Sequence, residues 1–455
     1  MDGVVTETFV ERVRELRKRG GPNAFVGVRL PSTFSPLTLL SNYDEHGVIA
    51  SYERPDAEFA LVAVGESARA ELAPGGAASD VRDAAARLFG PVETEAETLR
   101  PRVLGGFAFR QDREAGEPWA DFGCGSLLLP ELLFVRDGAL SGVVIAPDVD
   151  PLRATALVGA VRSAGARPAS EPFGGPSGVP LTVLRDIDRD SWRTSVSKIA
   201  KEVRDGLYEK AVLATSRELG GDGTIDVGTT MAHLREDYPH CHLFTVSMGG
   251  ATFLGASPEL LVGLNAGEVR ALGLAGSARR GATAADDDQA GQALLDSAKD
   301  RIEHETVVRA IREALTDATT NLRAPNQPVL RKLRNIQHLS TEISGQALPE
   351  IDVLGLVERL HPTPAVCGWP TDAARKVIAA HEPMDRGWYA GPIGWMDAAG
   401  DGEFAVALRS ALVRETRAWL FAGNGIMGDS DAAAELAEVE LKFSPLAEAL
   451  SGTPD

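Results

Sequence analysis

The chain has 455 residues, of which 44% are hydrophobic, so it can bury one large core or the cores of about two to three average domains. Its formal net charge of −19 argues against nucleic acid or an anionic membrane as the main partner. The three cysteines lack C-x-x-C spacing, and no apolar run reaches the ~18 residues of a membrane span, so we expect reduced thiols in a cytoplasmic protein.

Residues 1–185 begin with a polar amphipathic helix and then alternate short β-rich runs with helical runs. Strands are expected at 24–30, 59–65, 103–110, 126–136 and 138–146, and helices at 79–90 and 151–165. Short strands separated by turns favour an antiparallel sheet with helices packed on it. Residues 166–180 are rich in Pro, Gly and Ser, which indicates either a linker or a long loop within one domain.

Residues 186–455 show the same alternation of short β-rich runs and helical runs, and we expect them to form one structural domain with residues 1–185. Helices are expected at 190–207, 225–237 and 371–380, in a short segment opened by Ser257-Pro258-Glu259, and near 289–316 after an acidic loop at 281–291. Strands are expected at 210–216, 243–248, 251–257, 269–276, 329–346, 391–398 and 403–416.

The stretch after Arg409 combines a strand, glycines and a helix. The run 418–423 predicts a strand, the glycines at 423, 425 and 428 predict a turn, and 429–442 predict a helix capped by Ser430 or Asp431. The glycines also spell G-x-G-x-x-G, but a dinucleotide site needs a further strand, and only 443–455 remain. A dinucleotide binder is therefore the least favoured alternative.

Two acidic pairs have helical spacing, namely Asp300 with Glu303 and Glu435 with Glu438. Residues at i and i+3 lie on one helix face, so each pair can direct two carboxylates to one place. If the two helices face each other, the converging carboxylates need a cation, and an all-oxygen set suits Mg²⁺. Alternatively, both pairs are ordinary solvated helix faces.

Several individual residues can also be interpreted either as functional groups or as ordinary structural residues. Lys210 opens an apolar strand and Glu259 follows Ser-Pro, so each is either a catalytic group or an ordinary strand-edge or helix-end charge. Arg409 lies in an alternating strand and either binds an anionic substrate or forms a structural salt bridge. His338 lacks the spacing of a zinc ligand.

Ten runs occur in the order found in the chorismate-utilising enzymes, and the chain resembles that family. They are KAVLATS, GASPELLV, LAGSARRG, KDRIEHE, NIQHLSTEISG, LHPTPAVCG, EPMDRGWYAGPIGW, GEFAVALRSALV, LFAGNGI and ELAEVELKF. The resemblance implies the anthranilate synthase component I-like fold, which is α+β. In it, a single large domain contains two large packed antiparallel β-sheets, with helices outside and the site between the sheets.

Within the family the details look most like isochorismate synthase. Ser277 stands where anthranilate and aminodeoxychorismate synthases usually carry threonine, and Ala365 where salicylate synthases usually do. The resemblance therefore implies Mg²⁺-dependent, reversible conversion of chorismate to isochorismate. Tyr389 is shared with salicylate synthases, so a synthase that also eliminates pyruvate is the nearest rival. A catalytically silent chorismate-binding homologue is a rival of another class.

The resemblance also assigns roles to residues. Lys210 would activate the water that attacks C2, and Glu259 would protonate the departing C4 hydroxyl. Glu303 and Glu438 would hold Mg²⁺, with Asp300 and Glu435 in support through water. Arg409 and Tyr389 would bind the enolpyruvyl carboxylate. The remaining substrate contacts implied are Gly276, Ser277, His338 and Ala365 around the ring, and Lys442 with the amides near Gly423 and Gly425.

Asn424 departs from the family pattern, which usually has a small residue there, and it could crowd the carboxylate-binding loop. Met427 and Gly428 are also less usual.

We expect a monomer, with a dimer as the alternative. The sequence leaves open whether the product feeds menaquinone, a siderophore or another aryl acid.

Overall fold

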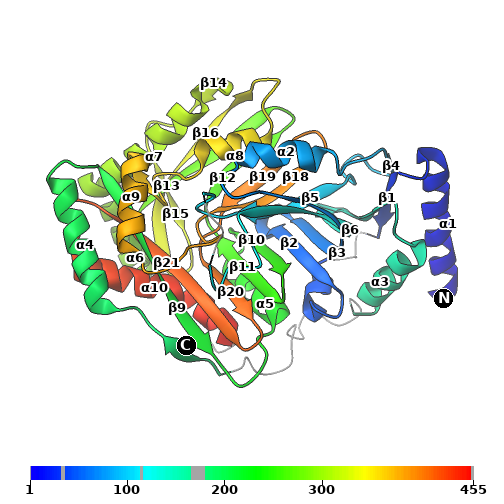
Figure 1. Ribbon diagram of the computed structural model, residues 1–455, viewed down its shortest axis with the longest axis horizontal. Helices are drawn as coiled ribbons and strands as arrows, with labels where there is room; N and C mark the ends of the chain where they lie inside the picture. Colours follow the sequence, from blue (N-terminus) through cyan, green and yellow to red (C-terminus); the bar gives the residue numbers. More distant parts are fainter. Residues whose placement is uncertain (1, 32–35, 113–115, 165–179, 452–455) are drawn as a thin grey trace.

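The structure is a computed structural model that describes residues 2–31, 36–112, 116–164 and 180–451 (Figure 1). All but the last residue of the linker candidate at 166–180 thus lies outside the described residues. The helices are α1 (Asp2–Gly20), α2 (Ala78–Ala86), α3 (Pro151–Ala164), α4 (Arg189–Arg204), α5 (Val227–Asp237), α6 (Ala284–Asp296), α7 (Ala298–Thr316), α8 (Val353–Leu360), α9 (Thr371–His381) and α10 (Ala432–Ser451), with short 3₁₀ turns η1 (Pro36–Asn42) and η2 (Pro55–Ala57). The strands are β1 (Phe25–Leu30), β2 (Val48–Arg54), β3 (Phe59–Glu71), β4 (Val92–Thr94), β5 (Arg102–Phe107), β6 (Gly125–Asp137), β7 (Leu140–Ile145), β8 (Thr182–Arg185), β9 (Lys210–Gly220), β10 (His242–Met248), β11 (Ala251–Ser257), β12 (Leu260–Asn265), β13 (Glu268–Arg279), β14 (Thr319–Arg323), β15 (Val329–Lys332), β16 (Ile336–Ala347), β17 (Gly368–Trp369), β18 (Pro392–Asp397), β19 (Gly402–Val406), β20 (Ser410–Arg414) and β21 (Arg417–Ile426).

The strands form one hydrogen-bonded network with two arms that diverge from the long strand β6. One arm follows β6, β3, β2, β10, β11, β20, β21 and β9. The other follows β6, β5, β18, β19, β12, β13 and β16. Every pairing in the two arms is antiparallel, and the helices lie around the strands (Figure 1). The α+β antiparallel fold is therefore confirmed, with the two expected sheets joined at β6.

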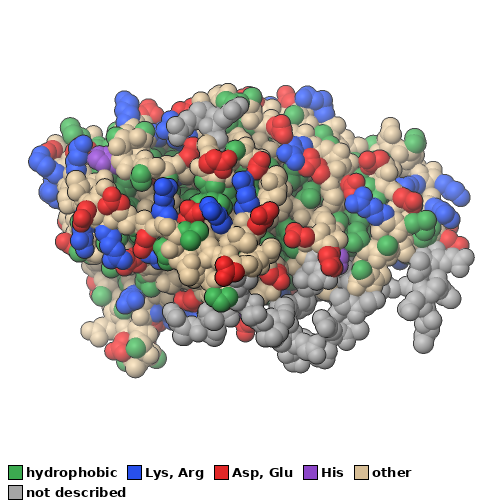
Figure 2. All heavy atoms as spheres, turned by 60° about the horizontal axis from the view of Figure 1, so that its bottom comes forward, with side chains coloured by type: hydrophobic (Ala, Val, Ile, Leu, Met, Phe, Trp, Pro, Cys, Tyr) green, Lys and Arg blue, Asp and Glu red, His purple; other side chains and the backbone are tan. Residues whose placement is uncertain are grey.

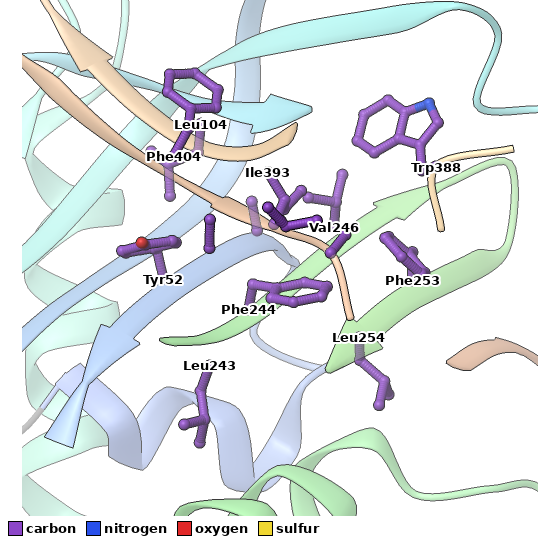
Figure 3. Packing of buried hydrophobic residues seen from close by; sticks show 14 of the residues in the cluster. Tyr52, Leu104, Leu243, Phe244, Val246, Phe253, Leu254, Trp388, Ile393 and Phe404 are labelled. Atoms are coloured by element: carbon purple, nitrogen blue, oxygen red, sulfur yellow. The ribbon is translucent and has the colours of Figure 1, made fainter. Parts of the chain in front are cut away.

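The parts before and after residue 185 share this network. Strand β2 pairs with β10, and β5 pairs with β18. Phe244 and Phe253 of the first arm, whose ring centroids are 5.4 Å apart, belong to a buried hydrophobic cluster to which both arms contribute (Figure 3). Phe404 of the second arm is fully buried in the same cluster. Because burying each such ring contributes about 1.5–3 kcal/mol, this core fixes the two arms relative to each other.

Three expected elements are wrong in the second part. The single strand expected at 329–346 is two strands, because β15 turns back and pairs with β16. Residues after Pro258 do not open a helix, because Leu260–Asn265 form β12 between β13 and β19. The acidic stretch is not a loop, because Thr283 caps α6 and accepts a hydrogen bond from the Asp286 amide at 3.2 Å. Ser297 then separates α6 from α7 and caps the second helix.

Two further corrections concern the strands near the C-terminus. Strand β21 does not stop at the glycines but continues to Ile426, because Gly423 and Gly425 pair with Ala214 and Val212 of β9. Arg409 does not lie within a strand. It separates β19 from β20 with a φ of 48°, a left-handed conformation that costs a non-glycine residue energy. The expected helix that follows is present as α10, with Asp431 as its cap.

Lys, Arg, Asp and Glu side chains are interspersed on the face shown in Figure 2. Attraction of an anionic substrate by this face would therefore be weak, so we expect the cations that bind such a substrate to lie inside a cavity.

None of the helices in the described part of the chain is long and apolar enough to span a bilayer. Cys124, Cys241 and Cys367 are buried free thiols, as expected.

Candidate active site

Every residue assigned a role from the sequence lines one cavity of about 290 Å³ between the two arms. Strands β9 and β21 supply one wall, while β13 and β16 supply the other. Helices α7 and α10 add the four carboxylates expected from their spacing. The cavity thus collects side chains that lie up to more than two hundred residues apart in the sequence.

Lys210 is 1% exposed at the start of β9, and its Nζ donates a hydrogen bond to Glu303 Oε1 at 2.8 Å. Gly425 makes room for this pair. A Cβ there would lie 2.5 Å from Lys210 Cε and 3.0 Å from Glu303 Oε1. The glycine is therefore required for close approach of β21 to the lysine, not for a turn.

Glu259 lies between β11 and β12 and is 2% exposed. Burial raises the pKa of its carboxyl to about 8, although the charge of Lys210 acts in the opposite direction. Its Oε1 atom has no hydrogen-bond partner among the described residues. At neutral pH Glu259 is therefore protonated, and it can donate that proton into the cavity.

Each of the four clustered carboxylates has a polar partner. Glu303 accepts from Lys210, Asp300 from Ser297 Oγ, and Glu438 from Lys442 Nζ at 2.8 Å. Glu435 accepts from Asn424 Nδ2 at 3.0 Å. Burial raises the pKa of Asp300 and of Glu435, and the negative charge of Glu438 adds to both shifts. Burial is the largest single influence on the Glu438 pKa and would raise it, but Lys442, His338 and Arg409 together outweigh burial and lower that pKa.

The donor set fits Mg²⁺ by its chemistry, since all four side chains offer oxygen. Within the described residues, no three acidic, imidazole or thiol side chains form a group that could hold a metal ion. Mg²⁺ in proteins is usually bound by only one or two carboxylates and keeps several waters, so a full cage is not required. Repulsion between Glu438 and the two carboxylates without a lysine partner in the described part of the chain, Asp300 and Glu435, also favours a cation among the acids.

Arg409 and Tyr389 also line the cavity. Arg409 has no ion pair among the described residues, and its buried Nη1 atom has no hydrogen-bond partner. Burial lowers the pKa of this guanidinium. Tyr389 stacks on Phe421 with ring centroids 5.4 Å apart. The Arg409 side chain is half-buried, and an unpaired guanidinium with a buried Nη1 atom is costly, so this geometry favours an anionic ligand over the structural salt bridge considered for Arg409.

His338, Ser277 and Gly276 form the wall from β13 and β16. His338 Nδ1 lies 3.0 Å from Ser277 Oγ and 3.3 Å from the Gly276 carbonyl oxygen. Burial lowers the pKa of His338 to about 3, so its imidazole is neutral. Gly276 has a φ of 75°, and a Cβ there would lie 3.1 Å from the Cβ of Asp300. This wall is polar but uncharged, as a surface facing a substrate ring can be.

Residues 11–451 match a family model described as "Chorismate binding enzyme". The chain belongs to this family. A salicylate biosynthesis isochorismate synthase from Pseudomonas aeruginosa is 42% identical over 359 residues, which are 78% of this chain and 75% of that protein. The isochorismate synthase MenF from Bacillus subtilis is 35% identical over 353 residues, 77% of this chain and 75% of that protein. The solved structure of the menaquinone-specific isochorismate synthase MenF from Escherichia coli is 26% identical, has a TM-score of 0.77 and covers 98% of this chain and 99% of that chain.

In this chorismate-binding enzyme, sequence reasoning missed Arg386 and Glu382. Arg386 is 4% exposed and lines the cavity. It donates to the carbonyl oxygens of Val366 at 2.7 Å and Val212 at 2.9 Å, and its Nε donates to Glu382 Oε2 at 2.9 Å. The pair therefore ties strand β9 to the loop that carries Ala365. Its only local signal is an acid and an arginine at i and i+4.

Proposed function

We propose that the chain is an isochorismate synthase that converts chorismate reversibly into isochorismate with Mg²⁺. One arrangement supports this most: Lys210 and Glu259 are both buried in one cavity, where burial raises the pKa of Glu259 to about 8. The reaction needs a base for the incoming water and an acid for the departing hydroxyl.

We also propose a cytoplasmic location, which the three reduced cysteines fit.

In the proposed mechanism Lys210 accepts a proton from water while the water oxygen bonds to C2 of chorismate. Both ring double bonds shift, from C1=C2 and C5=C6 to C1=C6 and C4=C5, the bond between C4 and its hydroxyl breaks, and Glu259 protonates the leaving oxygen. One water is added and one is released, so substrate and product are isomers. The reverse reaction uses the same two groups with their roles exchanged, which explains the proposed reversibility.

The remaining residues hold the substrate dianion. Arg409 and Tyr389 would bind the enolpyruvyl carboxylate, and Lys442 with the amides near Gly423 and Gly425 would neutralise the remaining charge. Bound Mg²⁺ would supply positive charge to the ring carboxylate. Glu303 and Glu438 would hold it, with Asp300 and Glu435 in support.

Removing Mg²⁺ is expected to abolish turnover, and adding it back to restore turnover. We expect Glu438→Gln to raise the Mg²⁺ concentration for half-maximal rate at least about tenfold, because one ligand loses its charge. Glu440→Gln on the same helix is the matched control, since Glu440 pairs with Arg189 and does not line the cavity. Full activity in excess EDTA would contradict the metal assignment.

A salicylate synthase remains the second candidate, because Tyr389 lies in the cavity wall as that resemblance requires. The relative from Pseudomonas aeruginosa is named for salicylate biosynthesis, yet its name describes an isochorismate synthase. Release of pyruvate separates the two candidates, since only the salicylate synthase eliminates it. The convergence of every assigned residue on one cavity favours either enzyme over a silent homologue.

A further inference from the structure

We propose that Asn424 is a positioning residue that ties Lys442 to Glu435 and thereby sets the affinity of the carboxylate cluster for a divalent cation. The inference rests on the proposed function, because it concerns the same cluster. Asn424 is 2% exposed on β21, and its side chain points to α10 rather than into the cavity. It therefore does not crowd the substrate, which was the expectation from the sequence.

The Asn424 side chain uses both of its polar atoms. Its Nδ2 donates to the Glu435 backbone oxygen at 2.8 Å and to Glu435 Oε2 at 3.0 Å. Its Oδ1 accepts from Lys442 Nζ at 2.6 Å. A flipped amide would place its NH₂ group against the ammonium and its oxygen against the carboxylate, so the charges on both sides fix its orientation.

Lys442 contacts three protein acceptors in this arrangement and contributes its charge, not a hydrogen bond, to the substrate site. An ammonium group has three protons. Lys442 Nζ has three acceptors: the Gly423 oxygen at 3.0 Å, Asn424 Oδ1 at 2.6 Å and Glu438 Oε1 at 2.8 Å. Asn424 thus holds the lysine beside Glu438 while it holds the carboxylate of Glu435 from the other side. One side chain from β21 spans two turns of α10.

Loss of these bonds would free Glu435 and Lys442 to change their side-chain positions together. Lys442 competes with a cation for Glu438, so a lysine released from Asn424 is a stronger competitor. Partners that orient metal-binding groups typically account for about 10- to 100-fold in metal affinity. We therefore expect Asn424 to act on cation affinity more than on the chemical step.

The test measures Mn²⁺ binding by titration calorimetry and electron paramagnetic resonance, with Mn²⁺ standing in for Mg²⁺. Asn424→Leu keeps the size of the side chain and removes its hydrogen bonds, so we expect about tenfold weaker Mn²⁺ binding. Asn424→Ala leaves space for water to replace part of the bonding, so its loss should be smaller. At saturating metal, kcat of both variants should stay within about threefold of the unmodified protein.

Asn265→Leu is the matched control, because Asn265 is an exposed asparagine at the end of β12, outside the cavity. Mn²⁺ affinity within about twofold of the unmodified protein in both Asn424 variants would overturn the proposal. This holds even if their melting temperatures fall, because that pattern is expected of a purely structural residue. If the unmodified protein converts chorismate but binds no Mn²⁺, the metal assignment and this proposal both fail. If it binds Mn²⁺ but converts no chorismate, the proposed function fails.

Discussion

Replacing Lys210 with alanine is expected to lower the turnover of chorismate by about 10²- to 10⁴-fold, the contribution typical of a general base. Lys210 is buried in the cavity, where its Nζ is hydrogen bonded to Glu303. The measurement is the steady-state rate of isochorismate formation at saturating Mg²⁺. Binding of chorismate should persist, because the carboxylate-binding cations remain.

Lys201→Ala is the control for this substitution, since Lys201 is exposed on α4 and pairs with Asp205. A thermal unfolding curve establishes that Lys210→Ala still folds. If the folded Lys210→Ala protein turned over chorismate at the unmodified rate, the base would have to be assigned to another group.

Glu259→Gln is expected to cause a similar loss, about 10²- to 10⁴-fold, because glutamine keeps the shape but cannot give up a proton. The unmodified enzyme should lose activity as pH rises through about 8, where Glu259 ionises. The pKa of an unfolded glutamate is about 4.3. Between pH of about 4.3 and about 8, the folded protein therefore keeps a proton on Glu259 that the unfolded chain has lost. Stability should fall as pH rises through this window, and Glu259→Gln should remove that part of the dependence.

Melting temperatures at pH 6 and pH 9 test the stability part of this prediction. Glu259→Gln should gain stability relative to the unmodified protein at pH 9 and differ less at pH 6. The control is Glu342→Gln, an exposed glutamate on β16. An unmodified enzyme whose rate stayed constant from pH 7 to pH 10 would contradict the role of Glu259 as a protonated acid.

The sequence identified candidate site residues where the informative pattern lies within a single helix or strand. The i, i+3 spacing placed Asp300 with Glu303, and Glu435 with Glu438, on helix faces that line the cavity in the structure. The same reasoning could not decide between a solvated face and a shared site, because that depends on the packing of α7 and α10. The order of the family motifs supplied this information.

The errors arose where distant segments decide the conformation. Gly425 was assigned to a turn because glycine favours turns, but β9 pairs with it and Lys210 occupies the space of its missing side chain. Arg409 was placed in a strand from the alternation around it, which cannot reveal a single left-handed residue. Arg386 was missed because its acceptors lie on β9 and in a loop far away in sequence.

The most direct test of the central claim is identification of the products formed from chorismate and Mg²⁺ by NMR spectroscopy. We predict isochorismate without stoichiometric pyruvate, and the same chorismate-to-isochorismate ratio when the reaction starts from isochorismate. Pyruvate and salicylate as main products, or no conversion by the folded protein with Mg²⁺ present, would contradict the proposed function.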